Sequence, residues 1–324
     1  MTIRRRTLIT ATAASLAAPM LRAQTLPGGP VRIIVGFPPG GGTDILARVL
    51  APHLQAAWKT NVLIENKAGA AGVLAADFVA KAPADGNTLL MAHINSHAIA
   101  PALQAKLSYN AETDFAPIAL VGVTPNLLIC NNDQPAKTLK DLVALCRARP
   151  GHITFGSSGP ASAQHLALEL FKFQGKLFAL HIPYRGSGPL ITDLIGGQVM
   201  YSFETMTAAT PHVKGGKVVA VAQTRPARSK AYPNVPTLNE EGFPGFDATT
   251  WYGLAGPGKM SPSIVKRMNE DINKALAVPE VAERLAAAGA EDSGGTPERF
   301  AEFMKSERNK YSKLVKDAGI KIDS

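Results

Sequence analysis

The chain alternates two hydrophobic periods along most of its length, and this alternation constrains the fold more than any other feature of the sequence. Short apolar, β-branched runs occur at residues 31–35, 62–65 and 88–91, and apolar residues at helical spacing lie between them, at residues 43–58 and 73–80. Parallel strands need such crossover helices between them. The pattern therefore predicts a mostly parallel sheet that is covered by helices on both faces.

A second series of alternating strands and helices begins after residues 114–125. Its strands are expected at residues 127–130, 153–155, 179–182, 199–203 and 218–222, and its helices at residues 138–147 and 163–173. The apolar run at residues 190–195 continues the pattern. The series indicates a second α/β unit.

The last part of the chain, from about residue 250, lacks the strands for a third unit. One strand candidate at residues 251–255 is followed only by helical patterns, at residues 262–277, 281–287 and 297–317. Because a single strand cannot form a sheet by itself, we expect this segment to return to the first unit.

The sequence thus predicts an α/β protein of two Rossmann-like lobes, each with a central mixed sheet, and a cleft between them. Lobe 1 is expected to contain residues 24–126 and 248–324, and lobe 2 residues 127–247. The chain would cross twice between the lobes. Open α/β sheets bind ligands at the carboxyl ends of their strands, so the cleft is the expected site.

The first 23 residues have the pattern of an export signal. Arginines at residues 4–6 precede an apolar stretch at residues 7–20, and a small residue stands before a possible cleavage point at Gln24. Without this segment the formal net charge falls from +9 to +5, because four arginines and no acids are removed. We expect a signal peptide at residues 1–23 and a periplasmic protein, exported by the general or the twin-arginine route.

Several classes of function and site find no support in the composition. The Lys and Arg residues are scattered and not interleaved with aromatic residues, which argues against nucleic-acid binding. His93 and His97 have the spacing of a zinc pair but no Glu between them and no long helix, so we expect neither a metal nor a cofactor. Cys130 and Cys146 are expected either to form a disulfide or to remain two buried thiols.

The first candidate site is the glycine-rich turn at residues 36–44, which follows a strand and opens a helix. Consecutive glycines let the backbone approach a ligand closely, and the start of the helix offers unpaired N–H groups to an anion. Gly42 stands where a phosphate loop needs Lys, so nucleotide hydrolysis is not expected. The candidate ligand-binding residues are Gly40, Gly41, Thr43 and Asp44. The alternative is a simple turn capped by Thr43 or Asp44.

Two further turns of the same chemical kind lie in the second unit. The turn at residues 156–162 contributes Ser157, Ser158 and Ser162, but Pro160 breaks the Gly-x-Ser-x-Gly pattern of a nucleophile elbow. The turn at residues 184–189 contributes Gly186 and Ser187, with Arg185 either pairing with a carboxylate or making a surface contact. Glu204, at the end of a strand, either accepts from a ligand in the cleft or is a solvated strand end.

In order and spacing, these motifs resemble the Bug/TctC family of periplasmic solute-binding proteins from tripartite tricarboxylate transport systems. The resemblance covers nearly the whole chain after the signal. It rests on residues 37–44, 65–72, 84–90, 156–162 with His165 and Leu166, 184–186, 234–237 with Glu241 and Gly242, and 251–253.

The resemblance implies a fold like that of type II periplasmic binding proteins, without enzymatic activity. Two lobes would close on a small carboxylate held by the first and second turns, with further contacts from Ser96 or His97 and from the Gly186 turn. The position of Glu204 is often Asp in this family, so the longer acid could change the preferred ligand. The implied partners are membrane transporter subunits, and a monomer is expected.

Two other functions remain alternatives at this point. An exported hydrolase could use Ser157 or Ser158 as a nucleophile together with a distant His. A ligand-sensing subunit of a signalling receptor would share the same binding chemistry as a transport protein.

Overall fold

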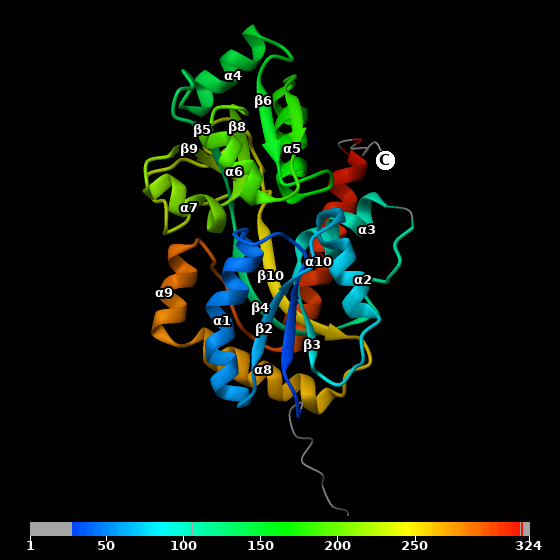
Figure 1. Cartoon of the computed structure of the whole chain (residues 1–324). Helices are drawn as coiled ribbons and strands as arrows, with labels where there is room; N and C mark the ends of the chain where they lie inside the picture. The colour runs from blue at the N-terminus through cyan, green and yellow to red at the C-terminus, as the bar shows by residue number, and fades with distance from the viewer. Residues whose placement is uncertain (1–27, 105, 318, 320–324) are drawn as a thin grey trace, which may run out of the picture.

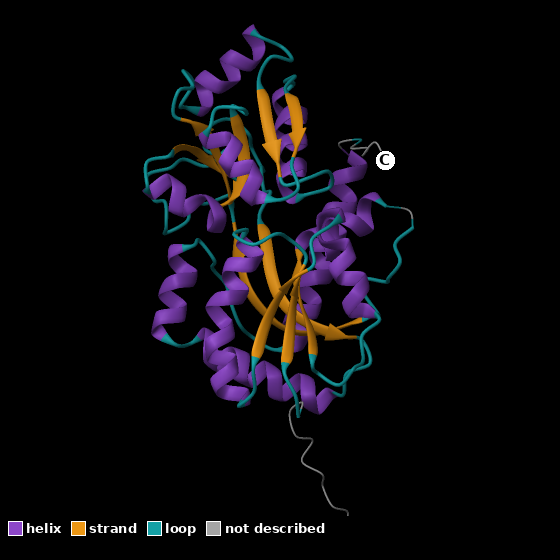
Figure 2. Ribbon diagram, in the orientation of Figure 1, coloured by secondary structure: helices purple, strands orange, loops and turns teal. Residues whose placement is uncertain are grey.

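A computed structural model of the protein describes residues 28–104, 106–317 and 319, in which two five-stranded sheets form two lobes (Figures 1 and 2). The predicted signal peptide at residues 1–23 lies outside the described residues. The sheet of the first lobe has the strand order β2-β1-β3-β10-β4. Its strands are β1 (Val31–Val35), β2 (Val62–Asn66), β3 (Thr88–His93), β4 (Phe115–Thr124) and β10 (Thr250–Pro257).

The sheet of the second lobe repeats the plan of the first, with the strand order β7-β6-β8-β5-β9. Its strands are β5 (Asn126–Asn131), β6 (Thr154–Ser157), β7 (Leu180–Pro183), β8 (Tyr201–Thr205) and β9 (Val218–Gln223). In each sheet three strands pair in parallel, while one strand inserts antiparallel between two others: β10 between β3 and β4, and β5 between β8 and β9. The predicted mixed sheets are confirmed.

Helices cover both faces of each sheet in the described part of the chain (Figure 2). They are α1 (Gly42–Trp58), α2 (Val73–Ala80), α3 (Ala100–Leu103), α4 (Leu139–Ala148), α5 (Ala163–Gly175), α6 (Ser187–Ile195), α7 (Met206–Lys214), α8 (Pro262–Leu276), α9 (Pro279–Ala287) and α10 (Pro297–Asp317). A 3₁₀ turn η1 (Ala70–Gly72) and a π turn η2 (Asn95–Ile99) precede α2 and α3. None of the described helices has both the length and the apolar character needed to span a bilayer.

The chain crosses between the lobes twice, and the sequence reading missed one of the strands involved. The sequence pattern predicted no strand at residues 114–125, but they contain β4, a strand of the first sheet. Only Pro125 separates β4 from β5 of the second sheet, and the return runs from β9 to β10. The apolar run at residues 190–195 belongs to helix α6, which begins at Ser187.

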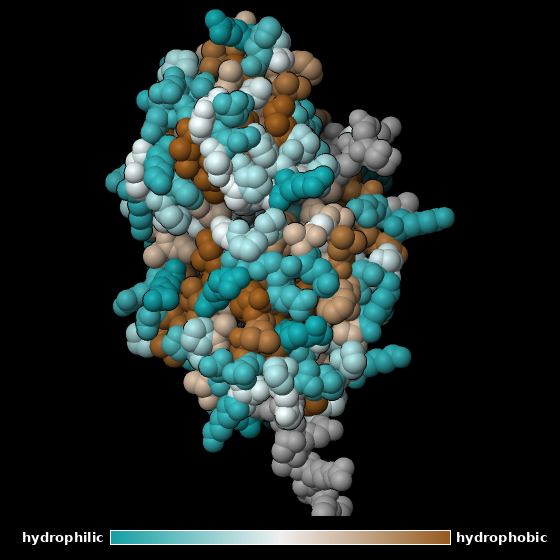
Figure 3. All heavy atoms as spheres, viewed as in Figure 1, coloured by the Kyte–Doolittle hydropathy of each residue, from teal (hydrophilic) through white to brown (hydrophobic). Residues whose placement is uncertain are grey.

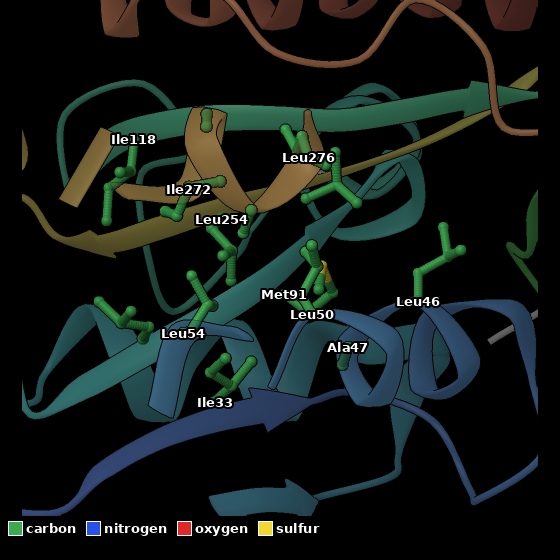
Figure 4. Close-up of a cluster of buried hydrophobic side chains, with 14 of the residues drawn as sticks. Ile33, Leu46, Ala47, Leu50, Leu54, Met91, Ile118, Leu254, Ile272 and Leu276 are labelled. Atoms are coloured by element: carbon green, nitrogen blue, oxygen red, sulfur yellow. The ribbon is translucent and has the colours of Figure 1, made fainter. Parts of the chain in front are cut away.

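Strands buried on both faces explain the apolar runs in the sequence. Ile33 packs with Leu50 and Leu54 of α1 on one face of the first sheet (Figure 4). The neighbouring Ile34 packs on the face covered by α2 and α10. Leu127 and Leu128 divide in the same way between the two faces of the second sheet. This two-sided burial is typical of sheets with helical crossovers.

Helix α10 and the chain crossings join the two lobes. In Figure 1 the helix lies along the first sheet and extends toward the second lobe. Its Leu314 packs against apolar residues of both lobes, and Lys310 pairs with Asp247 at 2.7 Å. Figure 3 shows polar side chains over most of the visible face, with apolar side chains gathered in smaller areas.

Both cysteines are free, buried thiols in the core of the second lobe. Cys130 lies on β5 and Cys146 on α4, and burial raises the pKa of each thiol to about 11. Of the two alternatives drawn from the sequence, the structure shows the thiols and not the disulfide.

The turn between β1 and α1 is held in shape by one buried carboxylate. Asp44 accepts from the backbone N–H of Gly40 at 3.0 Å, from the guanidinium of Arg48 and from the side chain of Asn66 at 2.9 Å. Burial raises its pKa, but these hydrogen bonds and the charge of Arg48 outweigh burial and hold the pKa below 3.8. Gly41 caps the helix without a side-chain bond, so neither Thr43 nor Asp44 is its N-cap residue.

Core packing predicts that truncation of two helical leucines has very different effects on the free energy of unfolding. Leu50 is fully buried beneath the first sheet, whereas Leu74 on α2 is 54% exposed. We expect Leu50→Ala to lower the free energy of unfolding by about 2–5 kcal/mol, because it leaves a cavity that the sheet cannot fill. Leu74→Ala should change it by less than about 1 kcal/mol. Urea unfolding followed by circular dichroism compares the two, and equal losses would contradict the burial seen here.

The carboxylate of Asp44 predicts a pH-dependent contribution to stability. We expect Asp44→Asn to lower the free energy of unfolding by about 1–3 kcal/mol near neutral pH, since buried donors lose their charged acceptor. The folded pKa lies below 3.8, so this contribution is complete above that pH and is lost as the pH falls below it. Urea unfolding at several pH values measures the difference between variant and wild type. The exposed Asp133→Asn is the control, and a difference that grows in acid would contradict the assignment.

Candidate functional site

A cavity of about 920 Å³ lies between the two lobes. The first lobe contributes the β1–α1 turn, the segment before η1 and the end of α3. The second lobe contributes the β6–α5 and β7–α6 turns. The lining residues are Gly36, Phe37, Pro38, Ala68, Gly69, Ala70, Ala71, Leu103, Gln104, Lys106, Ser158, Gly159, Pro160, Ala161, Tyr184, Arg185 and Gly186. The cavity therefore lies where strand-to-helix turns of both sheets meet.

The charged lining residues of this cavity are both cations. Lys106 comes from the first lobe and Arg185 from the second, and the described lining includes neither Asp nor Glu. Phe37 and Tyr184 add aromatic surface. A concave site with apolar walls and an excess of positive charge favours small anions that carry an apolar portion.

The lobes touch at the edge of the cavity through glycine and proline. A Cβ on Gly186 would lie 2.7 Å from the ring of Pro38, and the φ of +113° at Gly186 also disfavours other residues. Gly186 is therefore required for the close approach of the β7–α6 and β1–α1 turns. The lobes also touch where the backbone N–H of Ala163, at the start of α5, donates to the side chain of Asn95 in η2 at 2.9 Å.

A buried polar cluster lies behind the cavity wall and links three of the turns. Ser158 donates to the amide oxygen of Gln164 at 2.8 Å, and the amide nitrogen of Gln164 donates to Oε1 of Glu204 at 3.0 Å. Ser187 donates to the same oxygen at 3.0 Å. A Cβ on Gly41 would lie 3.8 Å from the hydroxyl of Ser187, so the α1 turn of the first lobe borders this cluster.

Glu204 is the centre of this cluster and is completely buried, so it is not the solvated strand end that the sequence left open. Its Oε1 atom also accepts from the backbone N–H of Thr205 at 2.7 Å, whereas its Oε2 atom has no hydrogen-bond partner. Burial raises the pKa of Glu204, and the hydrogen bonds from Gln164, Thr205 and Ser187 oppose the rise without cancelling it.

The start of helix α1 faces the second lobe beside this cluster. A Cβ on Gly42 would lie 2.4 Å from the hydroxyl of Tyr252 and 3.0 Å from that of Thr205. Glycine is required here because any side chain would collide with β10. Tyr252 is fully buried, and its hydroxyl has no hydrogen-bond partner. The N–H end of α1 and two unpaired oxygens thus occupy one small region of the interface between the lobes.

The serines of the second turn have different surroundings. Ser157 is fully buried, lies 2.6 Å from Nε2 of His181 and donates to the backbone oxygen of Gly159. Burial and the neighbouring His165, whose ring stacks on His181 at 3.9 Å, lower the pKa of His181 to about 4. Ser162 accepts from the backbone N–H of His165 as the N-cap of α5. Ser157 has a nearby imidazole but is closed off from solvent.

Ser96 and His97 lie in the core of the first lobe. The Ser96 hydroxyl contacts Nδ1 of His97 at 2.9 Å, and the His97 ring packs edge-on against Phe115 with its centroid 4.5 Å away. His97 is fully buried, and burial lowers its pKa to about 3. Among the described residues, no group of three or more His, Cys, Asp or Glu residues could hold a metal ion.

The predicted site residues therefore separate into three sets. Ser158 and Gly186 line the cavity, and Gly41, Ser187 and Glu204 gather behind its wall. The others hold turns or pack inside a lobe, and their ligand contacts stay predictions; they are Gly40, Thr43, Asp44, Ser96, His97, Ser157 and Ser162.

Sequence reasoning missed several residues of this region as site residues. Phe37 and Tyr184 stand inside the motifs that carry the family resemblance, so those motifs could have identified them. Lys106 and Gln164 carry no local signal of a binding site. Lys106 follows the short helix α3, and Gln164 is the second residue of α5. Tyr252 also stands inside one of the motifs that carry the resemblance, at residues 251–253, and β10 brings it to the site by returning to the first sheet.

Comparisons with known proteins agree with this geometry. A family model described as "Tripartite tricarboxylate transporter family receptor" matches residues 46–320. The chain is 38% identical to protein BugT of Bordetella pertussis over 310 residues, which cover 95% of each chain.

Two solved structures share the whole fold. Rpa4515 of R. palustris with adipate superimposes with a TM-score of 0.88 at 32% identity, covering 91% of this chain and 99% of that one. The periplasmic binding protein BugD gives 0.87 at 32% identity, with the same coverage. The fold class is confirmed, and these relatives lend no support to a hydrolase or to a receptor-sensing subunit. The chain belongs to the tripartite tricarboxylate transporter receptor family, the Bug/TctC family that its motifs resemble.

Proposed function

We propose that the protein captures a small organic carboxylate in the periplasm and delivers it to the membrane subunits of a tripartite tricarboxylate-type transporter. The observation that carries the proposal is the cavity between the lobes, whose charged lining residues are Lys106 and Arg185 and whose described lining includes no acid. A related structure contains adipate, a dicarboxylate. The proposed lobes are residues 24–126 with 248–324 and residues 127–247, and the proposed protein is a monomer.

Binding in this proposal uses charge and closure, without covalent chemistry. The turns of both lobes reach the cavity, so a ligand held by both favours the arrangement in which the lobes touch. Arg185 can form two parallel hydrogen bonds to a carboxylate, and Lys106 supplies a point charge on the opposite lobe. Phe37 and Tyr184 contact the apolar part of the ligand, whose length the remaining lining limits.

Paired acids and amides test this proposal directly. We expect linear dicarboxylates, adipate among them, to bind in isothermal titration and to raise the thermal stability of the protein, by about 2.7 kcal/mol at a concentration of 100 Kd. The corresponding neutral diamides, such as adipamide, should bind far more weakly because they lack the charge that complements Lys106 and Arg185. Equal affinity for acids and amides, or no binding by any carboxylate, would refute the proposal.

Substitutions at two glycines distinguish an effect on ligand binding from an effect on folding. A Cβ on Gly41 meets nothing closer than 3.8 Å, so Gly41→Val should leave the free energy of unfolding within about 1 kcal/mol of wild type. The added side chain occupies the approach to the α1 amides, so the Kd for adipate should rise at least about tenfold. Gly29→Val, at a position with nothing within 4 Å of the added Cβ, is the control and should change neither quantity. Unchanged adipate binding by Gly41→Val would place the ligand elsewhere.

A further inference from the structure

We infer that Glu204 is a neutral carboxylic acid whose Oε2 hydroxyl donates a hydrogen bond to the bound carboxylate. The inference rests on the proposed function and identifies the residue that selects the ionic form of the ligand. It assigns to Glu204 the role of a donor, in contrast to the acceptor role expected from its carboxylate type.

The hydrogen bonds of Glu204 are distributed as in a protonated acid. Oε1 accepts three donors, from Gln164, Ser187 and the backbone of Thr205, whereas Oε2 accepts none. An ionised carboxylate shares its charge over both oxygens, and both then seek donors. In a neutral acid one oxygen accepts like a carbonyl and the other carries a proton. The unpaired Oε2 of this fully buried residue is the oxygen left to carry that proton.

Two deeply buried aspartates of the chain are paired with arginines. Asp44 is 3% exposed and pairs with Arg48, and Asp271 is 4% exposed and pairs with Arg267. Glu204 is fully buried, and the ion pairs of the described residues do not include it. A buried carboxyl group without a cation lowers its free energy by taking up a proton.

The surroundings of Glu204 favour an anion as the missing partner of Oε2. The N–H end of α1 borders the Ser187–Glu204 contact through Gly41 and faces the unpaired hydroxyl of Tyr252 through Gly42. Helix N–H groups and a tyrosine hydroxyl present donors to an anion. An ionised Glu204 among them would repel a carboxylate, whereas a neutral Glu204 adds a third kind of donor. All of these groups then present hydrogen-bond donors to the ligand, and none of them carries a negative charge.

Few other titratable groups face Glu204. Its partners on α5 and α6 are the uncharged Gln164 and Ser187, and Thr205 follows it on β8. From β10 the phenol of Tyr252 faces it, and burial raises the pKa of that phenol well above neutrality. Tyr252 therefore stays uncharged over the pH range in which Glu204 would lose its proton. Raising the pH through the pKa of Glu204 should replace a donor by a negative charge and weaken binding.

Infrared spectroscopy tests the neutral state without a ligand. In the difference spectrum of wild type minus Glu204→Gln, recorded near pH 7, we expect the C=O band of a protonated carboxyl group. The matched control is Glu169→Gln, which removes a partly buried glutamate that has Lys172 at 2.7 Å, and its spectrum should show the loss of carboxylate bands. Burial raises the pKa of Glu169, but hydrogen bonds from His165 and Lys172 outweigh burial and lower the pKa to about 2. A carboxylate band for Glu204 overturns the inference even if adipate binds, and the proposed function then survives. The wild-type spectrum titrated with pH gives the same answer if Glu204→Gln fails to fold.

Titration with adipate tests the donor role. As the pH is raised from neutral, we expect the Kd of the wild type to rise and that of Glu204→Gln, whose amide keeps a donor, to stay constant and within about threefold of the wild-type value at neutral pH. Glu204→Ala should raise the Kd roughly tenfold or more. Loss of adipate binding by a folded Glu204→Gln, or a wild-type Kd independent of pH, overturns the donor role. A protonated band in a protein that binds no carboxylate refutes the proposed function instead, and the donor role with it.

Discussion

The structure depends on a contact between two strand-to-helix turns that belong to different sheets. Gly186 of the second lobe meets Pro38 of the first, and the start of α1 meets Ser187 and Thr205 of the second lobe, at distances that leave little space for a side chain at Gly186 or Gly42. Helix starts carry N–H groups without helical partners, which are costly to bury unless something accepts from them. Where such helix ends meet between two lobes, their N–H groups favour the binding of a negatively charged ligand.

The region between the lobes has two zones, which differ in charge and in burial. The outer zone is an open cavity with Lys106 and Arg185, where solvent and salt moderate the charges and where ligands can be attracted from a distance. The inner zone around Glu204 is buried, uncharged in our inference, and built from hydrogen bonds within the second lobe, with the start of α1 from the first lobe beside it. In the proposed function, charge in the outer zone attracts anions, and the inner zone selects among them.

Rigid elements hold these zones in place. Asp44, with Arg48 and Asn66, fixes the turn before α1, and the two-sided cores beneath Leu50 and around Cys130 leave the sheets little freedom to deform. The two lobes are connected by the β4–β5 and β9–β10 crossings and by the far end of α10. This division fits a binding protein that changes the separation of its lobes and keeps the lobes themselves unchanged.

The sequence by itself determined the fold class, most helices and strands, and the three turns that face the ligand region, because hydrophobic period and glycine placement are local signals. It predicted no strand at β4, and it left the state of Cys130 and the burial of Glu204 open. Only the tertiary structure decided that His97 lies in a core while Lys106 lines the cavity. The reason is physical: whether a polar residue is buried, paired or facing a ligand depends on neighbours distant in the chain, and no local pattern encodes them.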